Sequence, residues 1–468
     1  MIDRLRAIVG TDQVLQGGDM DRFSHDFTRA YDWAPLAVVR PANTGEVSAI
    51  VKLANELGTP VVPVSGNTGL AGGARADGAI MVSLERMNSI REIRPDARLA
   101  VVEAGVVLAS IRAAAEEHGL LFPLTFGAQG SAMIGGNLST NAGGSNVLRY
   151  GNTRDLVLGI EAVLPTGEVM DLMSELHKDN SGYNLKHLLI GAEGTLGIIT
   201  AAVLKLVPKP RAYATAMVAV PALEGALDLL NRLQEASGGA VEAFEYMPRA
   251  YIEDHLRVIT GAREPFGAPH EINLLIELGA TSHDAAEPGP DGRTPIAVLL
   301  EEVLGDMFET GAVVDAVVAQ NEAQRREMWE RREAAAEVSM SHPFRQIHDV
   351  CVALDKVPTF LARADAKRKE IDPESGVNIV SHLGDGNVHY TVQFSRQDDR
   401  LASTMMEQIE DIVLGLGGSF SAEHGIGTSK LPSMARRKNA VALGAMRAIK
   451  AALDPNGILN PGKVLPEG

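Results

Sequence analysis

Cysteine is almost absent from this chain, since its 468 residues include only Cys351. A single cysteine excludes an intramolecular disulfide and a metal site built from several thiolates. Cys351 lies in the short apolar run Asp349–Ala353. We therefore interpret it as a small buried hydrophobic residue, not as a nucleophile.

Positive charge is also scarce, with 43 lysines and arginines against 60 acidic residues and a net charge of −17. Binding of nucleic acid needs a basic surface, so we exclude nucleic acid as a partner. No hydrophobic window reaches the length that spans a bilayer, and the first fifteen residues lack the apolar stretch of a signal peptide. The expectation is a cytoplasmic protein that is not an integral membrane protein.

The dinucleotide pattern G-x-G-x-x-G after a strand is missing, but two other glycine-rich segments are present. Residues 65–73 follow the short apolar strand 61–64, and residues 126–146 are rich in Gly, Ser, Thr and Asn. Within the second segment, residues 135–144 offer many backbone N–H groups without a Cβ nearby, which suits a pyrophosphate. The alternative is a pair of irregular surface loops. Because an ordinary connection is rarely so long, we predict a functional loop over 126–146.

The order of predicted elements divides the chain. Residues 35–84 predict a strand, a helix, a strand, a loop and a strand, and Pro165-Thr166-Gly167 predicts a hairpin turn. Pro208-Lys209-Pro210 ends an apolar strand and marks a boundary. Beyond it, strand-like and helix-like segments alternate, which predicts an α+β domain with helices on one face of a sheet. The predicted domains are residues 1–208, 209–437 and 438–468, the last being a helix followed by a tail.

Two histidines flank a turn-like tetrapeptide. Gly384–Asn387 has the composition of a hairpin loop, so His382 is predicted opposite His389 on one face of a sheet. Directly opposed residues have Cβ atoms about 4.5–5.5 Å apart, so both imidazoles can bind one ion. Two solvated histidines paired across a hairpin remain the alternative. Asp385 is a competing ligand, which we interpret instead as a turn former.

A carboxylate and an imidazole lie side by side in Ser421–Gly427. Glu423 as third ligand gives a site of two histidines and one carboxylate with open positions, which suits catalysis. His424 can then take the proton of a hydroxyl whose pKa the metal lowers. If the hydroxyl belongs to a 2-hydroxy acid, its oxidation also removes the hydrogen of C2 as a hydride. A redox cofactor must then accept that hydride.

Several motifs together resemble the FAD-binding flavoproteins of the vanillyl-alcohol-oxidase type. They are PVVPVSGNTGLAGGA from residue 60, GSAMIGGNLSTNAGGSNVLRYGN from residue 130, Lys178–Tyr183 and Gly191–Thr200. The C-terminal motifs HLGDGNVHY, SAEHGIG and DPNGILNPGK are similar to those of its D-2-hydroxy-acid dehydrogenase branch. That branch includes D-lactate, glycolate and D-2-hydroxyglutarate dehydrogenases. The resemblance covers nearly the whole chain.

The resemblance implies an α+β fold, with a two-subdomain FAD-binding domain of the vanillyl-alcohol-oxidase (PCMH) type. A C-terminal α+β cap domain with an antiparallel sheet completes it. The resemblance also implies zinc or manganese on His382, His389 and Glu423, His424 as base, and noncovalent FAD. The implied FAD-binding residues are Val64, Ser65, Gly66, Asn67, Thr68, Gly69, Leu70, Gly130, Ser131, Ile134, Gly135, Gly136, Asn137, Thr140, Asn141, Ala142, Gly143, Gly144, Tyr150, Gly151, Glu193, Gly194, Gly197, Ile198, Ile199 and Asn460.

The expected substrate is inferred from a motif that matches the branch and from two positions that depart from it. Trp329–Glu333 resembles the W-x-x-R-E motif of the branch, which implies that Arg332 clamps the substrate carboxylate. The D-2-hydroxyglutarate enzymes carry Lys where this chain has Ile347, and Asn where it has Thr391. Arg345 lies on the face of Ile347 and is a candidate to compensate. We therefore expect Arg332, Arg345 and Thr391 at a site for a small D-lactate-like monocarboxylate.

The alternatives are a D-2-hydroxyglutarate dehydrogenase and a flavin subunit of a glycolate-oxidising complex. The electron acceptor is left open between a quinone, a cytochrome and an electron-transfer flavoprotein, and an oxidase that uses O₂ is a further option. A homodimer is also left open.

Overall fold

The computed structural model describes residues 1–467, which divide into two compact units. The first comprises Met1–Gly143, Gly151–Pro208 and the chain from Glu423 onward; the second comprises Gly144–Tyr150 and Lys209–Ala422. One division follows Pro208, as the Pro-Lys-Pro sequence predicts. The last division follows Ala422, whereas the sequence placed it after residue 437. Hydrogen bonds from residues 426–429 to the first unit account for this difference.

The first unit begins with a small sheet of order β1-β2-β4-β3. Its strands are β1 (Val14–Leu15), β2 (Ala37–Val39), β3 (Val61–Val64) and β4 (Ile80–Ser83). β2, β4 and β3 are parallel, and the crossover between β2 and β3 is helix α2 (Thr44–Leu57). Asn43 caps this helix, because its Oδ1 accepts the N–H of Glu46 at 2.9 Å. These elements agree with the prediction for residues 35–84.

A second, antiparallel sheet of the first unit has the order β5-β6-β10-β8-β9. Its strands are β5 (Ile90–Arg94), β6 (Leu99–Glu103), β8 (Val157–Val163), β9 (Val169–Leu172) and β10 (Ile198–Lys205). The predicted hairpin joins β8 to β9: the N–H of Gly167, at a φ of 79°, donates to the carbonyl of Leu164. Two further short strands, β7 (Leu120–Leu121) and β11 (Val207–Pro208), pair with each other.

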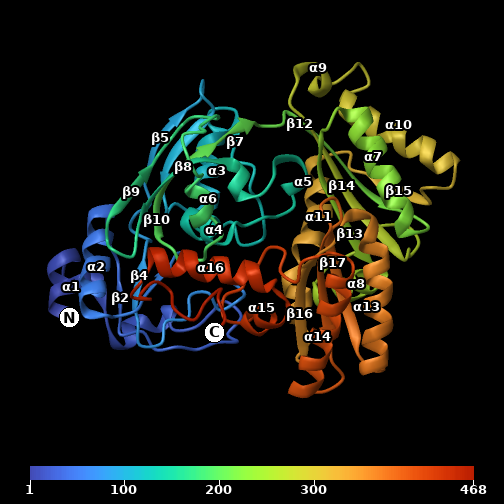
Figure 1. Cartoon of the computed structure of the whole chain (residues 1–468). Helices are drawn as coiled ribbons and strands as arrows, with labels where there is room; N and C mark the ends of the chain where they lie inside the picture. The colour runs from blue at the N-terminus through green and yellow to red at the C-terminus, as the bar shows by residue number, and fades with distance from the viewer. Residues whose placement is uncertain (468) are drawn as a thin grey trace. The chain divides into compact units, whose positions relative to one another are not determined.

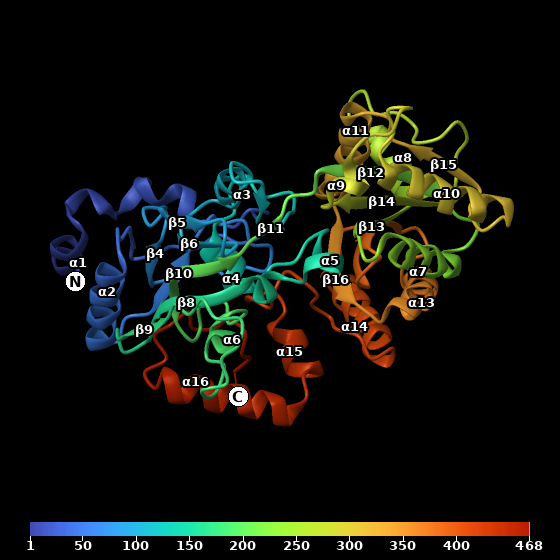
Figure 2. The ribbon, with the colours of Figure 1, turned by 90° about the horizontal axis from the view of Figure 1, so that it is seen from above.

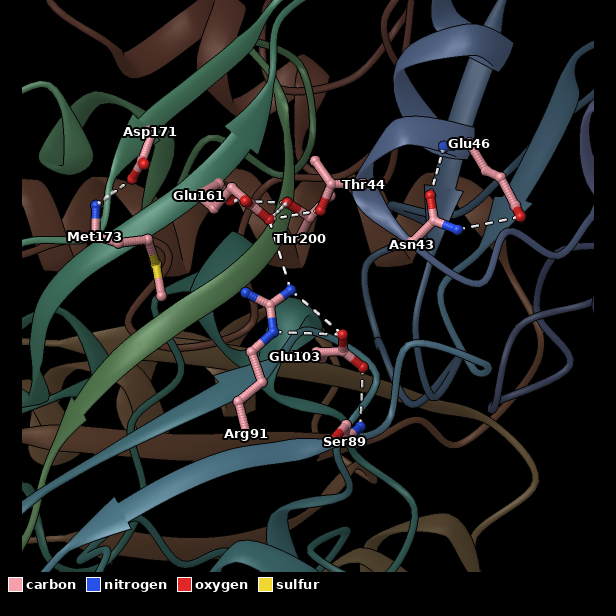
Figure 3. A network of polar contacts seen from close by, with 10 residues as sticks. All are labelled: Asn43, Thr44, Glu46, Ser89, Arg91, Glu103, Glu161, Asp171, Met173 and Thr200. Atoms are coloured by element: carbon pink, nitrogen blue, oxygen red, sulfur yellow. Dashed lines mark hydrogen bonds and ion pairs between the residues drawn. The ribbon is translucent and has the colours of Figure 1, made fainter.

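A polar network connects α2 to this second sheet (Figure 3). Glu161 on β8 accepts the hydroxyl of Thr44 at 2.5 Å and that of Thr200, on β10, at 2.8 Å. Arg91 on β5 lies 3.8 Å from Glu161 and 3.3 Å from Glu103. Since Thr44 is the first residue of α2, Glu161 ties the helix of the small sheet to two strands of the larger one.

The glycine-rich segment 126–146, predicted as a loop, contains helix α4 (Ile134–Thr140). Glycines make this short helix possible at its position, because a Cβ on Gly135 would lie 2.9 Å from the Cβ of Ala104. Asn141 ends the helix at a φ of 53°. The remaining helices of the first unit are α1 (Ile2–Val9), α3 (Leu108–Glu116), α6 (Lys186–Leu189), α15 (Leu431–Arg437) and α16 (Ala440–Leu453).

The C-terminal tail returns to the small sheet after α16. The N–H of Val61 donates to the carbonyl of Ile458, and the N–H of Asn460 donates to that of Val61, both at 2.8 Å. Leu459 lies between these bonds and is fully buried among the residues of α1, α2 and β4. The tail therefore extends the sheet beside β3.

The second unit is built on a seven-stranded sheet of order β15-β12-β14-β13-β17-β18-β16, and every neighbouring pair is antiparallel (Figure 1). The strands are β12 (Ala212–Ala219), β13 (Val241–Pro248), β14 (Ile272–Ala280), β15 (Asp315–Val318), β16 (Arg345–Cys351), β17 (Gly376–His382) and β18 (Asn387–Gln393). The helices are α5 (Val147–Tyr150), α7 (Ala226–Ser237), α8 (Arg249–Val258), α9 (His283–Ala286), α10 (Pro295–Glu309), α11 (Glu322–Glu333), α12 (Ala335–Met340), α13 (Val357–Ile371) and α14 (Asp399–Gly415).

Helices cover both faces of this sheet, which corrects the prediction of one covered face. Residues of α7, α10, α13 and α14 pack in one core with one set of strand residues. Residues of α8, α11 and α12 pack in another core with the alternate residues, such as Met217 and Leu275. Figure 2 shows α8 and α11 on one side of the sheet and α7 and α13 on the other. No helix within residues 1–467 is long and apolar enough to cross a bilayer.

The tail gives a first prediction about stability. Leu459→Ala removes a fully buried side chain, so we expect a loss of about 2–5 kcal/mol in the free energy of unfolding. The control is Val441→Ala, because Val441 belongs to the same C-terminal region but is 81% exposed. Thermal unfolding of the flavin-loaded protein compares the two. Equal melting temperatures for both variants would contradict the account of the tail.

Candidate active site

The two histidines of the predicted metal site lie on neighbouring strands of the second unit, but not directly opposite each other. His382 ends β17 and pairs with Asn387, whereas His389 on β18 pairs with Val380. The predicted register is therefore wrong by two residues. A shift of two keeps both side chains on the same face. Their ring centroids lie 5.4 Å apart with the planes at 81°, and each ring offers a nitrogen within 4.8 Å of the other.

The turn between these strands explains the register. It spans Leu383–Gly386, one residue earlier than predicted, and the N–H of Gly386 donates to the carbonyl of His382. A Cβ on Gly386 would lie 2.1 Å from the carbonyl oxygen of Val352, and the φ of Gly386 is 82°. The carboxylate of Asp385 accepts the N–H of Asn387 at 3.0 Å, which is the role of a turn former.

Glu245 on β13 lies directly across the sheet from His382. Its Oε1 is 2.8 Å from Nδ1 of His382, and its side chain is almost completely buried. Burial acts to raise the pKa of Glu245, but the charges and hydrogen bonds of His382 and Arg332 outweigh burial and lower it. A carboxylate that accepts the Nδ1 hydrogen selects the tautomer in which Nε2 carries the lone pair for a metal.

Asp349 stands in the same relation to His389. The two residues pair across β16 and β18, and Nδ1 of His389 lies 3.7 Å from Oδ1 of Asp349. The Asp349 side chain is buried and also accepts the amide of Asn387 at 3.0 Å. Each histidine therefore has a buried carboxylate on the adjacent strand away from the other histidine.

Arg332, predicted to clamp the substrate carboxylate, lies at the end of α11 and is 7% exposed. Its Nε donates to Oε2 of Glu245 at 2.6 Å, and its Nη2 lies 3.4 Å from the ring nitrogens of His382. One Glu245 carboxylate therefore connects the arginine and the imidazole. A guanidinium has five N–H donors, so the bond through Nε leaves donor capacity for a ligand.

Thr391 on β18 faces Ile347 on the edge strand β16. They share the face of Asp349 and His389, since side chains alternate along a strand. Thr391 is 1% exposed and Ile347 is 39% exposed. Arg345 lies on this face too, and its Nη1 donates to the carbonyl of His342 at 3.0 Å.

Glu423 and His424 are the first two residues of the first unit after the last division of the chain. The residue before them, Ala422, is held in the second unit, because its N–H donates to the carbonyl of Asp349 at 3.1 Å. Consecutive Cα atoms are about 3.8 Å apart, so Glu423 begins one residue away from a backbone bond to the strand that carries Asp349.

The predicted cofactor segments of the first unit include a run of unsatisfied backbone donors. Within residues 1–467, no N–H from Gly66 to Leu70 donates to a protein acceptor. Asn67 is held at a φ of 52°, and its side-chain amide donates to the carbonyl of His25. Successive unpaired N–H groups in a turn form a concave site for an anion, so this segment fits a phosphate group.

Glycines bring the second predicted segment close to the first. A Cβ on Gly66 would lie 2.1 Å from the carbonyl oxygen of Ser131. A Cβ on Gly136 would lie 3.3 Å from that of Ser65. Nearby, the amide nitrogen of Asn137 is buried without a partner in the described chain. An unpaired buried donor and a run of free N–H groups are what a bound pyrophosphate would satisfy.

Other predicted cofactor residues are placed differently. Gly144 and Tyr150 belong to the second unit, where the hydroxyl of Tyr150 donates to Glu242 at 2.8 Å. The Glu193 carboxylate accepts two backbone N–H groups from the loop after His424. Asn460 donates to the carbonyls of Gly73 and Glu193 at 3.0 and 2.7 Å.

Glu245 is the residue that the sequence did not indicate. The predicted elements contained no strand over 241–248, although the run Val241–Pro248 is largely apolar. A glutamate inside such a run is unusual, because a buried charge needs a partner. That signal was available and points to a buried ion pair.

Comparison with known proteins identifies the family of the chain. A family model described as an FAD binding domain matches residues 35–173, and one described as the C-terminal domain of FAD linked oxidases matches residues 209–464. The chain is 36% identical to a D-2-hydroxyglutarate dehydrogenase of Xanthomonas citri pv. viticola, over 95% of this chain and 92% of the relative. It is 34% identical to an enzyme of that name from Stutzerimonas stutzeri, over 99% and 98%.

A relative from Schizosaccharomyces pombe, named provisionally as a mitochondrial D-lactate dehydrogenase, is 32% identical over 97% of this chain and 86% of its own. Among solved structures, p-cresol methylhydroxylase with substrate bound matches 99% of this chain and 95% of its own, with a TM-score of 0.76 at 18% identity.

The fold is thus that of an FAD-binding flavoprotein of the p-cresol methylhydroxylase type, with an α+β cap. The chain belongs to the FAD-linked oxidase family and is an FAD-dependent dehydrogenase that acts on CH–OH donors.

The pair Arg332–Glu245 gives a second prediction. Arg332→Met leaves the buried Glu245 with His382 as its remaining partner, and Glu245→Met leaves Arg332 without its carboxylate, so each costs up to about 3–5 kcal/mol in the free energy of unfolding. The double variant removes both charges and costs less than the sum. Urea unfolding in a Trp33→Phe background reports on Trp329, which lies on α11 beside Arg332. Strictly additive losses, measured with a chelator present, would show that the two charges do not depend on each other.

Proposed function

We propose that this enzyme oxidises a small D-2-hydroxy acid to the 2-oxo acid with the help of a divalent metal on His382, His389 and Glu423. The observation that carries the proposal is the pair of buried carboxylates, Glu245 and Asp349, each across a strand from one histidine. Metal-binding histidines commonly donate their second ring N–H to a carboxylate, which fixes the tautomer and the ring orientation.

The donor set agrees with zinc or manganese. Two imidazoles and one carboxylate are borderline to hard ligands, and the chain has no second cysteine to build a thiolate site. Glu423 is the proposed third ligand, because Ala422 is bonded to the backbone of Asp349 and holds the start of the loop. Three protein ligands leave positions for the hydroxyl and the carboxylate of the substrate.

His424 is the proposed base. It follows Glu423 directly in the chain, and an imidazole titrates close to neutral pH. In the proposed step His424 takes the proton of the C2 hydroxyl, the C–O single bond becomes a carbonyl, and the C2 hydrogen leaves with its electron pair. Arg332 is proposed to orient the C1 carboxylate through the donors that Glu245 does not occupy.

FAD, when bound, supplies the acceptor for that electron pair. The residues proposed to hold it are the free N–H groups of Gly66–Leu70, the amide of Asn137 and the close-packed glycines of α4. Absence of a motif for a covalent link favours noncovalent binding. A quinone, a cytochrome or an electron-transfer flavoprotein would be the final electron acceptor.

Small monocarboxylates of the D-lactate type are the proposed substrates. Ile347 is 39% exposed on the face of His389 and pairs with Thr391, so an apolar and a small polar residue stand where a second carboxylate would need a cation. Arg345, the nearest cation on this face of β16, donates to a backbone carbonyl. The second candidate is D-2-hydroxyglutarate, which is favoured by the names of the two bacterial relatives.

The proposed metal gives a third prediction. Prolonged treatment with a chelator removes turnover while the flavin absorbance stays, and Zn²⁺ or Mn²⁺ restores it. Glu245→Gln lowers the affinity for the metal about 10–100-fold, because His382 loses the carboxylate that orients it. Titration of the metal-free flavoprotein with Zn²⁺ measures this change.

The matched control is Glu242→Gln. Glu242 is also buried on β13 and also bonds an arginine, Arg149, at 2.7 Å. It is expected to leave the metal affinity unchanged. Full activity after complete removal of metal would contradict the proposal.

The substrate gives a fourth prediction. With an artificial electron acceptor, kcat/KM for D-lactate exceeds that for D-2-hydroxyglutarate by at least tenfold, because the second carboxylate would lie beside Ile347. Ile347→Lys supplies a cation on the same face and is expected to narrow or reverse the ratio. Leu188→Lys, on an exposed residue of the first unit, is the control for added charge. A clear preference of the unchanged enzyme for the dicarboxylate would establish the second candidate instead.

A further inference from the structure

Glu193 makes contacts that a flavin-binding residue would not need. Its Oε1 accepts the N–H of Ile426 at 2.7 Å, and its Oε2 accepts the N–H of Gly427 at 2.8 Å. The residue itself is held at a φ of 52°, which is unusual for a glutamate. Both carboxylate oxygens therefore bind a loop more than 200 residues further along the chain.

The loop is shaped to receive this carboxylate. A Cβ on Gly425 would lie 2.7 Å from Oε1 of Glu193, and Gly425 has a φ of 73°. A Cβ on Gly427 would lie 2.0 Å from the carbonyl oxygen of Ala71, which also accepts the N–H groups of Thr428 and Ser429 at 2.9 and 3.1 Å. The glycines of the SAEHGIG motif thus permit two hydrogen-bonded contacts of the loop, one with Glu193 and one with Ala71.

The backbone of Glu193 is fixed as well. The side chain of Asn460 donates to its carbonyl at 2.7 Å, and the N–H of Glu193 donates to the carbonyl of Ser139 at 2.8 Å. A carboxylate on a rigid backbone is a rigid acceptor, so it can hold the loop in one position.

The residues that precede these hydrogen bonds are the proposed metal ligand and the proposed base. Glu423 and His424 precede Gly425, while Ala422 is bonded to the carbonyl of Asp349. Only three residues, Glu423 to Gly425, lie between the bond at Ala422 and the bond at Ile426. Glu423 and His424 therefore lie within three residues of the backbone that Glu193 holds.

We propose that Glu193 is a positioning residue, whose carboxylate holds the loop of Glu423 and His424 and makes no contact with the flavin. This inference rests on the proposed function for its consequence, but not for its direct test. Its two oxygens are occupied by main-chain donors, and a carboxylate beside a pyrophosphate would repel it.

The test is Glu193→Gln in the flavin-loaded protein. The amide keeps the shape of the side chain, but its nitrogen cannot accept an N–H, so one of its two hydrogen bonds to the loop is lost. Deuterium uptake of the peptide that covers residues 423–429 is expected to rise at least tenfold in rate, with or without added metal. The ratio of flavin to protein stays that of the unchanged enzyme.

Metal binding and turnover should change when the loop is less well held. We expect Zn²⁺ affinity to fall about tenfold or more and kcat to fall more than KM rises, with a changed pH profile of kcat because His424 is less well placed. Gly425→Ala should reproduce these effects from the other side of the contact, because its Cβ displaces the carboxylate. It serves as the second variant if Glu193→Gln does not fold.

Glu161→Gln is the matched control, since Glu161 is a glutamate of the same unit that bonds Thr44 and Thr200 and not the loop (Figure 3). It should change neither uptake in 423–429 nor metal affinity. Loss of flavin in Glu193→Gln, or unchanged uptake in the loop, would overturn the inference. Retention of metal by Glu423→Gln would overturn the proposed function alone, because the uptake measurement does not depend on metal.

Discussion

The register of one antiparallel sheet places a buried carboxylate across from each of two histidines. β13 pairs with β17 so that Glu245 faces His382, and β16 pairs with β18 so that Asp349 faces His389. A slip of one residue in either pair would turn the carboxylate to the opposite face. Because both acids are about 1% exposed, their cost of burial is offset only while these partners are in place. The same contacts that stabilise the sheet therefore orient both imidazoles.

In the first unit, backbone N–H groups instead of side chains form the candidate binding site. Its two glycine-rich segments place unpaired N–H groups and small residues together, and the packing of Gly66 against Ser131 leaves no space for a Cβ. The C-terminal tail adds Leu459 and Asn460 beside β3. Glu193 then connects this unit to the loop that begins with Glu423. That loop thus depends on a carboxylate more than 200 residues earlier in the chain.

The sequence predicted the elements that carry local signals. The helix predicted within residues 35–84 is α2, the hairpin at 165–167 has its glycine, and the division after Pro208 has its prolines. The side-chain face of His382 and His389 was also predicted, although the register was wrong by two residues. Turn composition determines which residues bend, but the packing of Gly386 against Val352 decides the pairing, and that contact is not local.

Long-range partners could not be predicted. Glu245 lies 137 residues from His382, and its strand was not recognised because its neighbours give no clear alternation. The second covered face of the sheet was missed for a related reason. The helix α8, which packs on that face, directly follows the unrecognised strand β13 in the chain. Tyr150 was assigned to the cofactor from its motif, whereas its hydroxyl bonds Glu242 of the second unit.

The central claim is that two histidines and a carboxylate hold a metal in this flavoprotein. X-ray absorption at the zinc edge of the zinc-loaded enzyme tests it most directly. The account predicts two nitrogen ligands at about 2.0–2.1 Å together with oxygen ligands and no sulfur, and it predicts that His389→Ala removes one nitrogen. A shell of oxygen alone, or one that His389→Ala leaves unchanged, would contradict the account.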